Sequence, residues 1–182
     1  MIIWIISGVI LIVALCFFIY FNKFNILENR VDNSLSQINV QLKRRADLIP
    51  NLVSVVKKVV KHEEGIIRAV TQARKELVSA KTTDAKVKAN GKLESTLKTI
   101  FALAENYPNL KSNKNFAELQ RELVATEDKV AYARQYYNDS ILRYNNLYKT
   151  FPGNMFVNIY GKKFKEYLQI SEAEKKSVKV EF

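Results

Sequence analysis

Few residues of this chain have the types and spacing that metal binding or nucleophilic catalysis requires. The single histidine, His62, is followed directly by Glu63 and Glu64. A zinc site of the HExxH kind needs a second histidine four residues further on, and the sequence contains none. The single cysteine, Cys16, lies in an apolar run elsewhere in the sequence. We therefore expect no metal and no cofactor, and we interpret His62 as a solvent-facing residue of a helix.

Paired carboxylates could instead serve in acid–base catalysis. Glu63 and Glu64 are adjacent in sequence, and so are Glu127 and Asp128. Adjacent residues point to different faces of a helix, which makes both pairs poor candidates for a general acid and base. The sequence also lacks the glycine-rich loop that holds a phosphate and the turn that presents a nucleophilic serine. We therefore predict a protein that is not an enzyme.

Two arginines fit a structural role. Arg45 and Arg134 lie at or beside the apolar stripes of predicted helices. Their candidate partners are Asp47, Glu127 and Asp139. A ligand site is the competing interpretation. We prefer partly buried ion pairs that fix the register of neighbouring helices.

Basic and aromatic residues together are typical of some nucleic-acid surfaces. The chain has a formal net charge of +11 and a group of tyrosines in its C-terminal half. Three of them, Tyr137, Tyr144 and Tyr148, recur at helical spacing, so packing in a helical core explains them better. We expect no nucleic-acid partner. The positive charge then indicates another acidic partner, and at a membrane that partner is the anionic lipid headgroups.

An apolar segment at the start of the sequence gives this charge its context. Residues 2–21 are apolar apart from Ser7 and Gly8, and at 1.5 Å per residue they span about 30 Å, the thickness of a hydrocarbon core. They lack the basic start and the small residues of a signal-peptide cleavage site, and Leu15 before Cys16 fits lipidation poorly. We therefore predict a retained transmembrane anchor. Its aromatic residues are Trp4, Phe17, Phe18, Tyr20 and Phe21.

Basic residues beyond the anchor predict its orientation. No Lys or Arg precedes residues 2–21, whereas Lys23, Arg30 and three consecutive basic residues from Lys43 follow them. The positive-inside rule keeps the side that carries these charges in the cytoplasm. We therefore expect a single-pass protein of the cell membrane with a cytoplasmic C-terminal domain.

Beyond the anchor, apolar residues recur at three- and four-residue steps, which is the period of an amphipathic helix. The first series contains Val31, Leu35, Ile38, Leu42, Ile49, Leu52, Val53, Val56 and Val60. Pro50 interrupts it, because proline has no backbone N–H and its ring clashes with the carbonyl four residues earlier. We therefore expect a kink or a new start here, with Asp47 capping a second helix that runs from Leu48 to about Ala80.

A third helix is predicted after Lys81-Thr82-Thr83-Asp84, which is typical of a loop and N-cap. Its end lies before Pro108, because the residue that precedes a proline avoids helical geometry. Asn90-Gly91 weakens the first part of this helix, so a start near Lys92 is a second interpretation.

The fourth helix is the longest pattern in the sequence. Ser112 or Asn113 can cap it, and its apolar positions continue as far as Lys149. Phe151-Pro152-Gly153-Asn154 then ends it.

A short apolar face with lysines follows the fourth helix. Met155 and Phe156 contribute to the face, and Lys162, Lys163 and Lys165 lie beside it. Contact with lipid headgroups or with a partner is one interpretation. Packing against the end of the bundle is the other, and the sequence leaves both open.

Three stretches of the sequence carry a family resemblance. They are SQINVQLKRRADLIPNLV followed by VKKVVKHE, then AENYPNLKSNKNFAELQRELVATEDKVAYARQYYNDSILRYN, and finally FPGNMF, which together cover roughly residues 27–164. In content and order they resemble the LemA family of bacterial membrane proteins. The resemblance implies an all-helical domain behind an N-terminal membrane helix, and it implies no agreed activity. Where the family often has a histidine before DLIPNLV this chain has Ala46, which argues against chemistry at that position.

The same resemblance implies a partner. LemA-like proteins are often associated with HtpX-type membrane zinc metalloproteases, so an HtpX-type membrane protease is a candidate partner. A role in membrane-protein quality control would follow from such a partnership.

We therefore predict an all-α protein with one N-terminal transmembrane helix. Residues 1–22 form the anchor, residues 23–165 an elongated antiparallel bundle of about four long helices, and residues 166–182 a charged, poorly ordered tail. The predicted function is a non-enzymatic, membrane-anchored adaptor or scaffold for a protein partner. The alternative is a structural protein that forms a homo-oligomer and organises or shapes the membrane.

Overall fold

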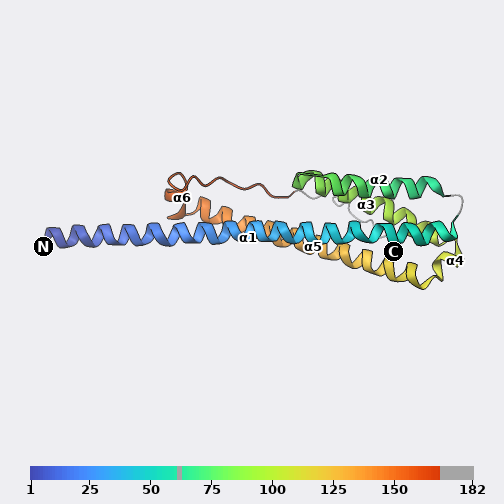
Figure 1. Ribbon diagram of the computed structural model, residues 1–182. Coiled ribbons are helices and arrows are strands. Elements are labelled where there is room, and N and C mark those ends of the chain that lie inside the picture. The colour runs from blue at the N-terminus through green and yellow to red at the C-terminus, as the bar shows by residue number, and fades with distance from the viewer. Residues whose placement is uncertain (61–62, 169–182) are drawn as a thin grey trace, which may run out of the picture. The chain divides into compact units, whose positions relative to one another are not determined.

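The protein is built from helices. The computed structural model describes residues 1–60 and 63–168, and these ranges contain no strand (Figure 1). The helices are α1 (Ile2–Val59), α2 (Glu64–Ser79), α3 (Thr83–Ala104), α4 (Pro108–Lys111), α5 (Lys114–Lys149) and α6 (Gly153–Phe156). Four of them, α1, α2, α3 and α5, are long, which confirms the predicted all-α bundle. His62 and most of the predicted tail lie outside the described residues.

The described chain forms two compact units. Unit 1 comprises Met1–Gln37 and Ala133–Leu168, and the described part of unit 2 comprises Ile38–Tyr132. Helices α1 and α5 therefore each supply residues to both units. The helices α2, α3 and α4 belong to unit 2, and α6 belongs to unit 1.

Unit 2 is held together by apolar side chains that recur at helical spacing. Its buried core includes Ile38, Leu42, Ile49, Leu52 and Val56 from α1, Ile67, Val70, Ala73 and Leu77 from α2, Leu93, Leu97 and Ile100 from α3, and Leu123 and Val130 from α5. Each fully buried Leu, Ile or Val contributes about 1.5–3 kcal/mol relative to an exposed one. The stripes predicted from the sequence therefore face one another in this unit.

Helix α1 continues through Pro50, so the predicted new start and the Asp47 cap are wrong. The carbonyl of Ala46 is the group that loses its helical donor, because the proline lies four residues further on. Arg74 of α2 replaces that donor, since its Nε–H donates to the Ala46 carbonyl at 2.8 Å. Ala46 is buried, and an unmatched buried carbonyl would be costly. A tertiary hydrogen bond thus allows the helix to pass a residue that usually ends one.

The interruption lies further along the chain. Helix α1 ends at Val59 and α2 begins at Glu64, so the single helix predicted from Leu48 to about Ala80 is wrong. Gly65 stands in the first turn of α2. The penalty of about 1 kcal/mol for glycine applies to helix interiors, so it does not weigh against this position.

The predicted caps of α3 and α5 are confirmed. The Oγ1 of Thr82 accepts a hydrogen bond from the N–H of Ala85 at 3.2 Å. The Oδ1 of Asn113 accepts one from the N–H of Phe116, also at 3.2 Å. Both side chains therefore replace helical acceptors that the first turn lacks.

Helix α3 begins at Thr83, so the start near Lys92 is wrong. Asn90 is buried in the first half of this helix and accepts a hydrogen bond from Arg45 at 3.1 Å. This contact offsets the low helix propensity of asparagine, on which the alternative start was based.

The predicted end of α5 is confirmed, since the helix stops at Lys149. Gly153 lies so close to the carbonyl of Leu147 that a Cβ at this position would collide with it. Only glycine fits this close approach, after which the chain enters α6 and returns alongside α1 (Figure 1).

We predict that Arg74→Met destabilises the protein by about 1–3 kcal/mol, because it leaves the buried Ala46 carbonyl without a donor while keeping an apolar stem. In a Pro50→Ala background the helix supplies its own donor, so the same change should have a much smaller effect. Unfolding of the full chain in mild detergent, followed by circular dichroism, measures both differences. Equal losses in the two backgrounds would show that Arg74 acts through another contact.

Candidate functional site

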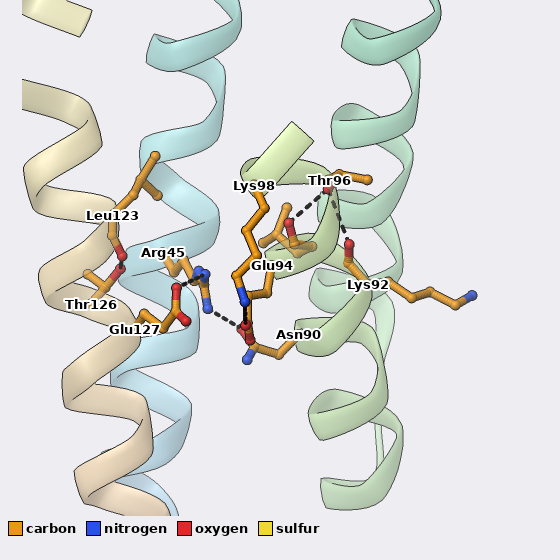
Figure 2. A network of polar contacts seen from close by, with 10 residues as sticks. Arg45, Asn90, Lys92, Glu94, Thr96, Lys98, Leu123, Thr126 and Glu127 are labelled. Atoms are coloured by element: carbon orange, nitrogen blue, oxygen red, sulfur yellow. Dashed lines mark hydrogen bonds and ion pairs between the residues drawn. The ribbon is translucent and has the colours of Figure 1, made fainter. Parts of the chain in front are cut away.

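A buried arginine lies among three helices of unit 2. Arg45 of α1 is only 1% exposed. Its Nη1 donates to the Oδ1 of Asn90 on α3 at 3.1 Å, and its Nη2 to the Oε2 of Glu127 on α5 at 3.3 Å. Figure 2 shows the guanidinium between the side chains of these two helices. One side chain therefore links α1, α3 and α5.

Two further charges border this pair. The Nζ of Lys98 lies 2.6 Å from the Oε1 of Glu94, both on α3. Burial raises the pKa of Glu127 above its ordinary value, and the nearby Glu94 carboxyl raises it further, although Arg45 acts in the opposite direction. Burial also lowers the pKa of Arg45 from its ordinary value. The cluster contains two basic and two acidic side chains, so its charges balance.

The structure brings two of the residues proposed for ion pairs into contact. Arg45 and Glu127 form a pair, whereas Asp47 is exposed on α1. Arg134 is half-buried on α5 and belongs to unit 1. Asn90 is a partner that sequence reasoning missed. The signal that could have found it is its spacing from the apolar positions of α3, which places it on the buried stripe.

A groove of about 340 Å³ opens on the surface of unit 2. It is lined by Asn39, Leu42, Lys43, Ala46, Asp47, Arg74, Leu77, Val78 and Lys86. Two of its cations are engaged within the chain, Arg74 by the carbonyl of Ala46 and Lys86 by the Oδ1 of Asn39 at 2.7 Å. Val78 is 63% exposed. The groove therefore offers apolar and basic groups side by side, and no enclosed acid–base pair.

Unit 1 contains a cluster of aromatic rings at the end of the apolar run. The aromatic cluster comprises Phe17, Tyr20 and Phe21 of α1 with Phe156 and Tyr160. The rings of Tyr20 and Phe156 stack with their centroids 5.7 Å apart, and those of Phe17 and Tyr160 meet edge to face at 5.0 Å. The hydroxyl of Tyr160 donates to the backbone carbonyl of Phe17 at 2.6 Å. Residues far apart in sequence are thereby fixed against the anchor.

The apolar core of unit 1 continues from this cluster. Phe24 is buried against Tyr144 of α5, with ring centroids 5.8 Å apart, and Val31 and Ile141 extend the contact. Burial raises the pKa of Tyr144 to about 12. The C-terminal part of α5 therefore packs along α1 beyond the apolar run.

A carboxylate of α1 holds two of the lysines singled out in the sequence. The Nζ of Lys162 lies 2.6 Å from the Oε2 of Glu28 and 2.9 Å from the Oδ1 of Asn25. The Nζ of Lys165 lies 3.4 Å from the Oε1 of Glu28. The hydrogen bond and the charge of Lys162 lower the pKa of Glu28, with partial burial acting against them. The side chains of Lys162 and Lys165 therefore contact α1 and do not extend into solvent.

The other residues assigned to the anchor and to the apolar face divide between surface and interior. Trp4 and Phe18 of α1 are exposed, and so are Met155 and Lys163. Phe156 packs on the anchor as part of the aromatic cluster. One side of this face therefore packs on α1, and the other side is open.

Among the described residues, α1 is the one helix whose length and composition would allow it to cross a membrane. It contains an 18-residue window of mean hydropathy 3.1 in which no residue is buried. Across residues 1–60 and 63–168, no three His, Cys, Asp or Glu side chains gather as a metal site would need.

Comparison with known proteins agrees with the resemblance seen in the sequence. The model of the LemA family matches residues 34–182. Magnetosome proteins MamQ 1 and MamQ 2 of Paramagnetospirillum magneticum are each 32% identical over 81 residues, which are 44% of this chain and 30% of the relative. Magnetosome protein MamQ of Magnetospirillum gryphiswaldense is 24% identical over 173 residues, covering 81% of this chain and 64% of the relative. The chain thus spans less than two thirds of the length of these relatives.

The pKa shifts of Glu28 and Glu127 predict opposite effects of pH on stability. Because the pKa of Glu28 is lowered, its contribution is complete above its ordinary value of 4.5 and is lost as the pH falls through the folded value. The pKa of Glu127 is raised, so its contribution is present below 4.5 and is lost as the pH rises through the folded value.

We therefore expect Glu28→Gln to destabilise the full chain by about 1 kcal/mol at neutral pH and by less in acid. Glu127→Gln is the matched control, and its effect relative to the wild type should change with pH in the opposite direction. Thermal unfolding in detergent between about pH 3 and pH 7 measures both trends. A Glu28→Gln difference that does not vary with pH would contradict the role given to the two lysines.

Proposed function

Because this chain belongs to the LemA family, we propose that it is a non-enzymatic adaptor or scaffold held on the cell membrane by residues 2–21. The observation that carries the proposal is helix α1. Its first part is apolar and unburied, as lipid contact requires, and the same unbroken helix supplies core residues of unit 2. The sequence between the anchor and the unit to which we assign protein binding contains no Gly/Ser-rich linker.

The use made of the charged side chains supports a non-enzymatic role. Arg45 and Glu127 are engaged in a pair that links helices, and Glu28 is engaged by lysines. A catalytic acid or base needs access to a substrate and a pKa suited to proton transfer. Charges that are held by partners within the chain suit the fixing of helix positions better.

The groove of unit 2 is the surface that we assign to the protein partner. Its exposed Val78 and Lys43 can contact an amphipathic segment, while Arg74 and Lys86 keep the walls in place through hydrogen bonds within the chain. The family resemblance is the basis for naming an HtpX-type membrane protease as that partner, with a role in membrane-protein quality control.

A photo-reactive amino acid at Val78 should therefore cross-link a membrane protease in native membranes, identified by mass spectrometry. The same amino acid at Val124, which is 47% exposed on α5 and outside the groove, is the control. We expect the protease adduct from position 78 only. Adducts of the chain with itself, together with a large homogeneous homo-oligomer in mild detergent, would instead support the alternative of a self-associating protein that organises the membrane.

The positive-inside rule supports a cytoplasmic position for the domain that follows the anchor. The single cysteine makes this testable, since Cys16→Ser leaves a chain without thiols. In that background Lys81→Cys, in the exposed connection before α3, should react with an impermeant maleimide only after cells are opened. Ile2→Cys, at the other end of the anchor, should react in intact cells. The reverse pattern would contradict this orientation.

A further inference from the structure

The segment after α5 exposes an unusual amount of apolar surface. Phe151 is 79% exposed, Met155 is 62% exposed and Ile159 is 66% exposed. Scattered apolar residues are common on protein surfaces, but three large ones within nine residues indicate a surface that contacts something apolar. The opposite side of the segment is occupied, since Phe156 and Tyr160 pack on α1.

The contacts with α1 fix the depth of this segment along the anchor. The Tyr160 hydroxyl bonds to the carbonyl of Phe17 at 2.6 Å. Phe17 lies four residues before the end of the apolar run at Phe21, which is about 6 Å inside it at 1.5 Å per residue. Figure 1 shows α6 beside α1, with the start of α1 extending past it. If residues 2–21 cross a bilayer, the segment must reach the same depth.

Both chain segments change from apolar to charged at the same level. On α1 the apolar run ends at Phe21, and Lys23 is the first charged residue. On the returning segment the last aromatic contact to the anchor is made by Tyr160, and Lys162 already pairs with Glu28 at 2.6 Å. A common boundary on two packed segments is what a single interface between hydrocarbon and headgroups would impose.

From this coincidence we infer that residues 151–160 form a second membrane contact of the chain. This contact lies in the headgroup interface of the leaflet that contains the C-terminal end of the anchor. Phe151, Met155 and Ile159 contact lipid, and Phe156 and Tyr160 join the segment to the anchor. Lipid is the occupant because any protein covering these side chains would itself have to enter the bilayer at this depth. The inference rests on the proposed anchoring of residues 2–21.

The inference also changes the role of the lysines. Lys162 and Lys165 are held by Glu28, whereas Lys163 is exposed beside them and is free to approach lipid phosphates. The aromatic and apolar side chains therefore supply most of the contact with lipid. The basic residues mark where the segment passes from hydrocarbon to headgroups.

Fluorescence of single tryptophans tests this depth. Trp4 is the only natural tryptophan, so Trp4→Phe gives a background in which Met155→Trp is the sole probe. Val78→Trp in the same background is the control, because Val78 has nearly the same exposed fraction, 63% against 62% for Met155. Each full chain is reconstituted in phosphatidylcholine and phosphatidylglycerol vesicles, with or without bromine on the acyl chains close to the headgroup.

We expect the Met155→Trp chain to lose most of its emission in brominated vesicles and to emit at shorter wavelength than the Val78→Trp chain, which should be little quenched. Ile159→Trp should repeat the result. Quenching of Met155→Trp no stronger than that of Val78→Trp would overturn the inference, whether water or a second copy of the chain covers the residue. The unmodified chain reports on Trp4, so it tests the anchoring of residues 2–21 separately. Quenching of Trp4 without quenching of Met155→Trp would contradict only the second membrane contact.

Discussion

The continuity of α1 through Pro50 is the constraint on which the rest of the structure depends. This helix supplies both the apolar run and the first stripe of the unit 2 core, and a break at Pro50 would separate Ile38 and Leu42 from Leu52 and Val56. The hydrogen bond from Arg74 to the Ala46 carbonyl removes the main reason for a break, because it satisfies the acceptor that the proline leaves without a donor. Arg74 of α2 thus supplies the hydrogen bond that α1 cannot make for itself at Pro50.

A second arginine, Arg45, links three helices of unit 2. Apolar stripes alone tolerate a shift of one helical turn, since each turn presents a similar surface. The fork of Arg45 does not tolerate it, because its two nitrogens need Asn90 on one side and Glu127 on the other. The cost of burying the guanidinium offsets much of the free energy that the ion pair contributes to folding. The pair therefore acts more on the placement of the helices than on stability. We therefore propose that Arg74 supports the continuity of α1 and that Arg45 sets the register of the helices of unit 2.

The elements that depend on local patterns could be predicted from the sequence, and those that depend on tertiary contacts could not. The anchor-length apolar run, the Thr82 and Asn113 caps and the end of α5 before Pro152 follow from neighbouring residues. The path through Pro50 depends on Arg74, and the start of α3 depends on Arg45 reaching Asn90, neither of which has a local signal. For the same reason Glu127 could be proposed as a partner of Arg45, but the choice between Glu127 and Asp47 required the fold.

The pairing of early and late residues of the chain in unit 1 has a consequence for its biosynthesis. The bond between Tyr160 and Phe17 joins residues 143 positions apart, and that between Lys162 and Glu28 joins residues 134 positions apart. The ribosome therefore completes the apolar run long before it makes the aromatic residues that pack on it. During that interval α2 and α3, whose contacts are close in sequence, can already assemble. Unit 1 therefore closes only after residue 160 has been made, so a chain that stalls before this point would lack the aromatic residues that pack on Phe17 and Tyr20.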